Sequence, residues 1–190
     1  MKPSSFRTIG DFARYLESVG ELRRVTVEVD PYLEMAPVIA ALDGRPVLFS
    51  HVVGSEYRVL SGQCSDRRYF ALALGCQVHE LIFRMADAYR LPQTPPRVAP
   101  ADAPCQEVVM PAVDLRRIPF LTHYAGDAGP YATAAIAIVD DPDTGPNVSF
   151  HRCLRLDSTR LAARLVERRG AATALQKAPG DLPVTICIGL

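Results

Sequence analysis

The sequence has 190 residues, 48% of them hydrophobic and 22% charged, and its 21 Lys and Arg balance 21 Asp and Glu. This composition excludes wholesale disorder, and zero net charge argues against general binding to nucleic acid or anionic membranes, which needs a basic surplus or face. No apolar run approaches the ~18 residues of a membrane helix; the longest, Ala132–Val139 and Val184–Leu190, have the length of strands. The five dispersed cysteines lack C-x-x-C spacing and the N-terminus lacks a signal-peptide pattern, so we expect reduced thiols in a cytoplasmic protein.

The first half of the chain, residues 1–91, is predicted to be a small αβ domain. Apolar side chains recur at helical spacing over Thr8–Gly20, with Thr8 as the expected N-cap and Gly20 as the residue that ends the helix. Valines alternate with polar residues over residues 21–30, as in a half-buried strand. The other elements expected here are a short helix, two strands and two further helices: Pro31–Leu42, Pro46–Val52, Tyr57–Ser61, Ser65–Leu74 and Val78–Arg90.

A proline-rich linker is predicted over residues 92–104, where five prolines fall within thirteen positions. This density disfavours helix and favours an extended, semi-rigid connection. We therefore place the domain boundary in this segment.

The second half, residues 105–190, is predicted to be rich in strands. Asp140–Pro146 combines Asp, Pro and Gly, which favours a hairpin turn. A helix is expected over Ser158–Lys177, followed by a buried strand over Leu182–Leu190. Few segments of this half remain to cover that strand, so we expect other polypeptide to complete its sheet. The other elements expected are two short extended pieces and two strands: Gln106–Met110, Asp114–Ile118, Ala132–Val139 and Asn147–Leu156.

The stretch Asn147–Arg152 is the first candidate for chemistry. On a strand, Asn147 would share one face with Ser149 and His151, while Arg152 would point the other way. An amide oxygen can ligate a hard cation such as Mn²⁺, and an arginine suits bidentate capture of a phosphate or carboxylate. The alternative is an ordinary edge strand with a polar outer face.

Two further groups of side chains carry weaker signals. The four histidines lack the spacing of zinc proteases or zinc fingers. Arg164, Arg168 and Arg169 form a basic stripe. Such a stripe is either a solvated face or an anchor for a phosphate-bearing cofactor.

Several segments together resemble the N-terminal part of the UbiD family, the reversible decarboxylases that use prenylated FMN. They are GELRRVTVEVDPYLEM, PVLFSHVVGSEYRVLSG, LPVTICIGL and, most specifically, VDLRRIPFLTHYAGDAGPYATAAIAIVDDPDTGPNVSFHRCLRLD. The last contains Asp-Leu-x-x-x-Pro, Asp-x-Gly-x-Tyr-x-Thr, Asp-Pro-x-Thr-Gly and Asn-x-Ser-x-x-Arg in that order. The resemblance extends over nearly the whole chain.

The resemblance implies an α/β fold, in which the small N-terminal αβ domain precedes part of a split β-barrel flavin-binding domain with a flanking helix. It implies that Asn147 helps to hold a Mn²⁺ ion at the flavin phosphate. It also implies that Arg152 is the catalytic arginine, approaching both cofactor and substrate carboxylate. The remaining positions that it assigns to cofactor binding are Ser149, Phe150, His151 and Arg168.

The chain departs from the family pattern at the metal site. The family has a histidine as a second metal ligand, and here Arg169 or Gly170 stands at that position. The family's remaining metal ligand and catalytic glutamates would lie beyond Leu190. The resemblance therefore leaves the metal dependence of this chain open.

The implied reaction is non-oxidative decarboxylation of an aromatic or α,β-unsaturated carboxylic acid. We expect the chain to be inactive alone and to act as the N-terminal portion of a longer enzyme, or as a subunit completed by a second chain. A flavin prenyltransferase would supply the cofactor, and homo-oligomers are typical of the family. Two alternatives are a non-catalytic binding or structural module, and a small flavin-reductase-like barrel, which the N-terminal half disfavours.

Overall fold

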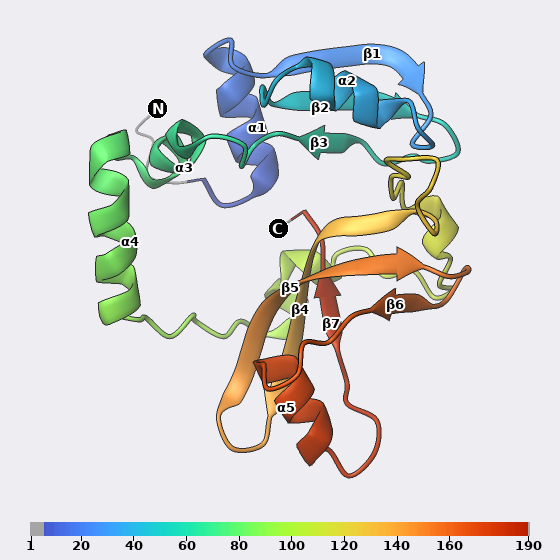
Figure 1. Cartoon of the computed structure of the whole chain (residues 1–190). Helices are drawn as coiled ribbons and strands as arrows, with labels where there is room; N and C mark the ends of the chain where they lie inside the picture. The colour runs from blue at the N-terminus through green and yellow to red at the C-terminus, as the bar shows by residue number, and fades with distance from the viewer. Residues whose placement is uncertain (1–5, 190) are drawn as a thin grey trace.

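The computed structural model describes residues 6–189, which form two lobes joined by an extended segment (Figure 1). Each lobe is built on its own sheet, with strand orders β1-β2-β3 and β6-β5-β4-β7. The first sheet comprises β1 (Arg23–Val29), β2 (Val47–Val52) and β3 (Val59–Ser61). The second comprises β4 (Tyr131–Asp141), β5 (Gly145–Arg155), β6 (Leu161–Ala163) and β7 (Thr185–Cys187).

Helices cover both faces of the first sheet. Strand β1 runs parallel to β2, and β3 runs antiparallel to it. The covering helices are α1 (Ile9–Ser18), α2 (Met35–Ala41) and α3 (Arg67–Leu74), whereas α4 (Leu81–Arg90) follows α3 and projects away from the sheet (Figure 1). One core packs Met35 of α2 against Phe49, and the other packs Leu16 of α1 and Tyr69 of α3 together. The predicted α/β class of this lobe is confirmed.

Local sequence signals set the ends of these helices. The Thr8 hydroxyl accepts a hydrogen bond from the N–H of Asp11, whose carboxylate accepts in return from the N–H of Thr8, and Gly20 follows the helix with φ 76°. Pro37 lies in the first turn of α2, where its missing N–H costs nothing. Gly75 ends α3 in the left-handed conformation. These helix signals are confirmed.

Strand β1 departs from simple alternation. Its register against β2 shifts between Val25 and Glu28, so that the strand carries a bulge. The bulge turns Val27 outward, where it is 68% exposed. The expected regular half-buried strand is therefore interrupted at this point.

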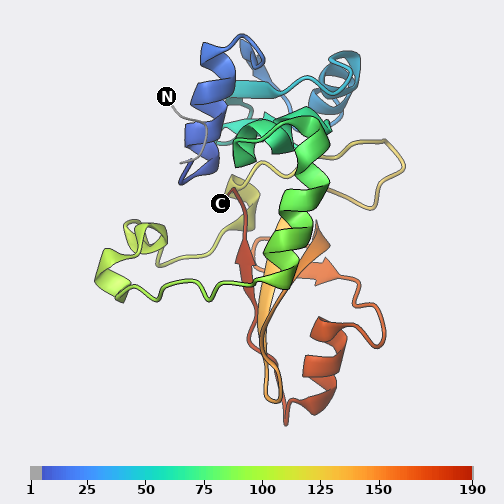
Figure 2. The same ribbon diagram turned by 90° about the vertical axis from the view of Figure 1, so that its left-hand side faces the viewer.

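The segment between the lobes contains single 3-10 turns. Pro100–Asp102 and Pro104–Gln106 each begin at a proline, and the rest of the linker is extended and exposed. The expected extended pieces at Gln106–Met110 and Asp114–Ile118 are wrong. The first begins at the end of a 3-10 turn, bends at Glu107 and Val108 and forms no strand. The second contains a 3-10 turn, in which the Asp114 carboxylate accepts a hydrogen bond from the N–H of Arg116 at 3.0 Å. Figure 2 shows this segment looping out beyond the end of α4.

The segment after this linker returns to the first lobe before entering the second. The N–H of Thr122 donates to the carbonyl of Pro31 at 3.1 Å, and its own carbonyl accepts from the N–H of Leu33 at 3.0 Å. Leu121 packs against the core on the α2 side of the first sheet. The loop that follows, residues 123–130, therefore leaves from a fixed point.

The second sheet is centred on the predicted hairpin. Strands β4 and β5 pair from Tyr131–Leu154 to Asp141–Gly145, and Gly145 has φ 79° at the turn. The buried carboxylate of Asp141 accepts from two backbone N–H groups of the turn and from the Lys177 ammonium at 2.9 and 3.0 Å. The hairpin prediction is confirmed.

The helix expected over Ser158–Lys177 is wrong in its first half. The Asp157 carboxylate accepts from the N–H groups of the next residues and forms a turn, after which β6 pairs with β5. Arg168 then adopts φ 61°, which interrupts helical geometry, and α5 begins at Gly170 and ends at Lys177.

The prediction of a buried strand over Leu182–Leu190 is also wrong. Strand β7 is short and pairs only with β4, at the edge of the sheet. Ile186 and Ile188 are 37% and 47% exposed. Leu190 lies outside the described residues. Over the residues described, no helix combines the length and the apolar character needed to cross a bilayer.

Candidate functional site

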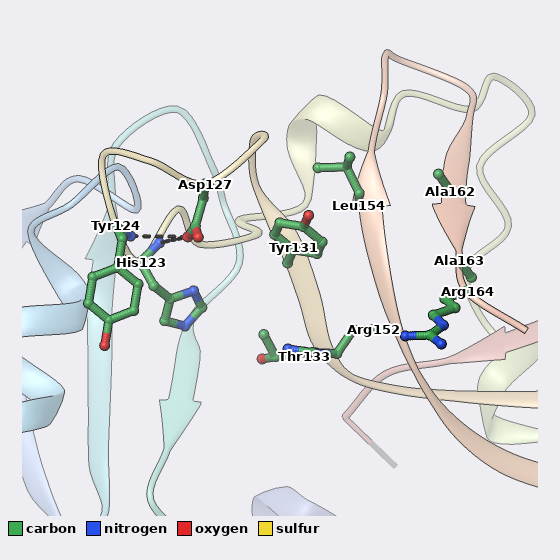
Figure 3. A pocket seen from close by; sticks show the side chains of 10 residues that line it. All are labelled: His123, Tyr124, Asp127, Tyr131, Thr133, Arg152, Leu154, Ala162, Ala163 and Arg164. Atoms are coloured by element: carbon green, nitrogen blue, oxygen red, sulfur yellow. Dashed lines mark hydrogen bonds between the residues drawn. The ribbon is translucent and has the colours of Figure 1, made fainter. Parts of the chain in front are cut away.

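A cavity of about 710 Å³ opens between the loop that precedes β4 and the strands β4, β5 and β6 (Figure 3). This volume lies within the range of small-molecule sites in proteins. Its lining residues are His123, Tyr124, Asp127, Tyr131, Thr133, Arg152, Leu154, Ala162, Ala163 and Arg164.

Asp127 fixes the loop on one side of this cavity. Its Oδ2 accepts hydrogen bonds from the backbone N–H groups of His123 and Tyr124, each at 3.0 Å. A Cβ at Gly129, which has φ 151°, would lie 3.2 Å from the Leu154 side chain, so a glycine lets the loop pass close to β5. The carboxylate is thus engaged in holding the loop, and the His123 ring lies beside the cavity (Figure 3).

Two arginines, Arg152 and Arg164, line the cavity just beyond the end of the β5–β6 ladder. The pairing of β5 with β6 ends at Cys153–Ala163, and Arg152 and Arg164 are the residues that come next to this last pair in the two segments. Both line the cavity, and within residues 6–189 neither takes part in an ion pair. Like charges that line one cavity repel each other. A bound anion would relieve that repulsion.

The alternation predicted along β5 is confirmed by burial. Asn147, Ser149 and His151 are half-buried, whereas Phe150 and Arg152 are exposed. The Ser149 hydroxyl lies 3.0 Å from Nε2 of His151. The buried Cys153 continues the same face of β5. Asn147, Ser149 and His151 therefore lie on the opposite face of the strand from Arg152. Of the candidate site residues on β5, the cavity brings in Arg152 alone.

Asn147 lies against the start of α5. A Cβ at Gly170 would overlap the Asn147 amide, so only glycine leaves that amide in place. Among the described residues no side chain caps this helix, whose preceding residue, Arg169, is extended. Arg168 stands just before it in the left-handed conformation. The half-buried face of β5 therefore meets a helix start flanked by two arginines.

The described part of the chain does not by itself fit a Mn²⁺ ion. It contains no group of three His, Cys, Asp or Glu side chains close enough to hold a metal. Asn147 offers one amide oxygen, and Gly170, beside it, offers no side-chain ligand. A flavin phosphate fits better, because the guanidiniums of Arg152 and Arg164 supply unpaired hydrogen-bond donors.

Sequence reasoning assigned Arg168 and missed Arg164 as a lining residue of the cavity. Arg164 belonged to the basic stripe, but its position at the cavity with Arg152 depends on the β5–β6 pairing. His123 and Thr133 were also missed. The sequence feature that could have identified them is the run of small and polar residues between Leu121 and Thr133.

Comparison with known proteins identifies the family. Residues 13–89 match the 3-octaprenyl-4-hydroxybenzoate carboxy-lyase (UbiD) N-terminal domain, and residues 97–190 match the Rift-related domain of the same carboxy-lyase. The chain belongs to the UbiD family. The expectation drawn from the sequence motifs is thus confirmed.

The similar proteins are longer than this chain and include decarboxylases. Anhydromevalonate phosphate decarboxylase from Methanothermobacter thermautotrophicus is 35% identical over 181 residues, which are 93% of this chain and 42% of that protein. An evolved dimeric form of the UbiD-class enzyme HmfF from Pelotomaculum thermopropionicum, in complex with prenylated FMN, is 36% identical with a TM-score of 0.91. That match covers 97% of this chain and 45% of HmfF.

Two further solved structures agree. HmfF in complex with FMN matches with a TM-score of 0.90 and 36% identity, over 96% of this chain and 42% of HmfF. Apo 3,4-dihydroxybenzoic acid decarboxylase (AroY) from Klebsiella pneumoniae matches with a TM-score of 0.88 and 26% identity, over 97% of this chain and 42% of AroY. The chain thus spans less than half the length of these relatives.

Proposed function

We propose that this chain forms the flavin- and carboxylate-binding part of a decarboxylase that uses prenylated FMN and acts on aromatic or α,β-unsaturated carboxylic acids. The observation that carries the proposal is that Arg152 and Arg164, neither of which has an ion-pair partner among the described residues, line one cavity. The HmfF complexes with prenylated FMN and FMN support it, because their fold matches this chain closely.

Each arginine has a role in this proposal. Arg152 orients the substrate carboxylate and strips it of water, and Arg164 holds an anionic group of the flavin nucleotide. Ser149, Phe150, His151 and Arg168 contact the cofactor elsewhere, and Asn147 is the residue that we assign to a metal site. Prenylated FMN, when bound, supplies an electron sink for the carbon that loses CO₂.

We propose that the group that delivers the proton lies outside the described residues. Decarboxylation ends when an acid protonates the carbon that has lost CO₂. The cavity contains one carboxylate, Asp127, and that group already accepts two backbone hydrogen bonds. We therefore propose that the acid comes from the further length that the relatives possess or from a second chain, and that a flavin prenyltransferase supplies the cofactor.

Comparing FMN with riboflavin tests the proposal on this chain directly. FMN carries the phosphate that Arg164 is proposed to recognise, whereas riboflavin does not. We expect FMN to bind about tenfold more tightly in calorimetric titrations, and Arg164→Gln to remove most of that difference. Arg67→Gln, at an exposed position on α3, is the matched control and should keep it. Equal affinity for the two flavins in the unmodified chain would contradict the assignment.

A further inference from the structure

A second cavity, of about 630 Å³, lies on the first lobe where α1 passes over β2 and β3. It shares no lining residue with the Arg152 cavity. Its lining residues come from the α1 helix, from the three strands of the first sheet and from the loop that leads into β3. The function proposed above makes no use of it.

The floor of this cavity is apolar. Leu48 and Leu60 are paired across β2 and β3, and both pack partly against the core beneath α1. The α1 helix presents Gly10 and Ala13 to the cavity. A Cβ at Gly10 would make only ordinary contacts at 3.6 Å or more, so the backbone does not require glycine there. Small side chains on α1 therefore leave the two leucines partly uncovered.

The rim is charged, and its carboxylates are already paired. Glu17 accepts two hydrogen bonds from Arg24, at 2.8 Å each. Glu56 is paired with Arg117, which also accepts a hydrogen bond from Ser55 through its backbone carbonyl. These contacts hold the loop in front of β3.

One guanidinium on the rim, that of Arg58, has no ion-pair partner among the described residues. Arg14 is paired with Asp11, whereas Arg58 has no ion-pair partner among residues 6–189. Arg58 is exposed and lies on the rim immediately before β3, next to Tyr57. The cavity thus combines an apolar floor with one unpaired, permanently charged donor group.

We propose that this cavity is a second ligand site, which binds a small organic anion with an apolar body. Arg58 would receive the carboxylate or phosphate in a bidentate contact, and the Leu48–Leu60 pair would cover the body of the ligand. Because the two cavities share no residue, this site does not depend on the Arg152 cavity or on the proposed function.

Methyl NMR with benzoate as the probe tests the site and locates it. The second cavity has methyl groups on Ile9, Ala13, Leu48 and Leu60, whereas the Arg152 cavity has them on Thr133, Leu154, Ala162 and Ala163. We expect benzoate to shift the first set in a saturable titration. Benzamide, which lacks the charge, and acetate, which lacks the apolar body, should each bind about tenfold more weakly.

Three variants separate the possible outcomes. Arg58→Gln should weaken benzoate binding about tenfold, and Ala13→Leu, which fills the hollow, should abolish it. Arg152→Gln should leave the shifts of the first set unchanged. The proposal is overturned if benzoate moves neither set of methyl groups, if it moves only the set around Arg152, or if Arg58→Gln binds as tightly as the unmodified chain.

Discussion

The two arginines of the cavity lead to a prediction that links stability to binding. Arg152 and Arg164 line one cavity just beyond the end of the β5–β6 ladder, and neither has an ion-pair partner among the described residues. Cross-strand charge pairs are worth about 0.2–1 kcal/mol, and repulsion has the opposite sign. Arg164→Gln should therefore stabilise the ligand-free chain by about 0.2–1 kcal/mol, which raises Tm by at most about 4 °C in a chain of this size.

Added phosphate should raise the Tm of the unmodified chain above that of Arg164→Gln. An anion bound between the guanidiniums stabilises the folded chain by about 1.4 kcal/mol at ten times its Kd, whereas Arg164→Gln loses most of this gain. The assay is thermal unfolding at low ionic strength, where the repulsion is least screened, with and without inorganic phosphate. Arg67→Gln serves as the control for a general charge effect.

The reasoning would be refuted in either of two ways. A lower unfolding temperature for Arg164→Gln than for the unmodified chain, measured without phosphate, would show that Arg164 is held by a favourable contact. Equal stabilisation of Arg164→Gln and the unmodified chain by phosphate would show that the anion binds elsewhere.

Three further predictions follow from the hydrogen bonds and burial of single side chains. Hydrogen bonds from Arg116 hold the pKa of Asp114 at about 2, so the stabilising contribution of this carboxylate should be present above its unfolded pKa and lost as pH falls toward 2, which an NMR titration of Asp114 checks. Burial raises the pKa of the Cys153 thiol, so a thiol reagent should modify the exposed Cys105 in the folded chain and Cys153 only after unfolding; early labelling of Cys153 in a mass-spectrometric time course would contradict this. Asp127→Ala removes the acceptor of two backbone N–H groups, so hydrogen exchange of the loop before β4 should accelerate, and unchanged exchange would show that other contacts hold the loop.

The sequence was sufficient to predict those parts of the fold that depend on contacts between residues close together in the chain. The cap at Thr8 and the Asp140–Pro146 turn formed as predicted, because their side chains bond to backbone groups a few residues away. The two faces of β5 also followed from alternation alone. Contacts between distant segments were harder to predict. The apolar spacing after Ser158, for example, suits a helix as well as the β6 strand that forms.

The same distinction explains what was missed at the site. Arg152 was identified from its motif, but its position at one cavity with Arg164 depends on the register between β5 and β6, which no local pattern encodes. The left-handed conformation of Arg168 likewise gave no sequence signal, although it separates β6 from α5. Register and rare backbone conformations are properties of the assembled sheet.

Flavin occupancy tests the central claim most directly. The chain would be produced together with a flavin prenyltransferase, and its ultraviolet–visible spectrum and native mass would be measured, along with those of the Arg152→Gln/Arg164→Gln double variant. The account predicts close to one flavin per chain in the unmodified protein and a large loss in the double variant, with both folded. A folded, colourless unmodified chain, or full occupancy in the double variant, would contradict it.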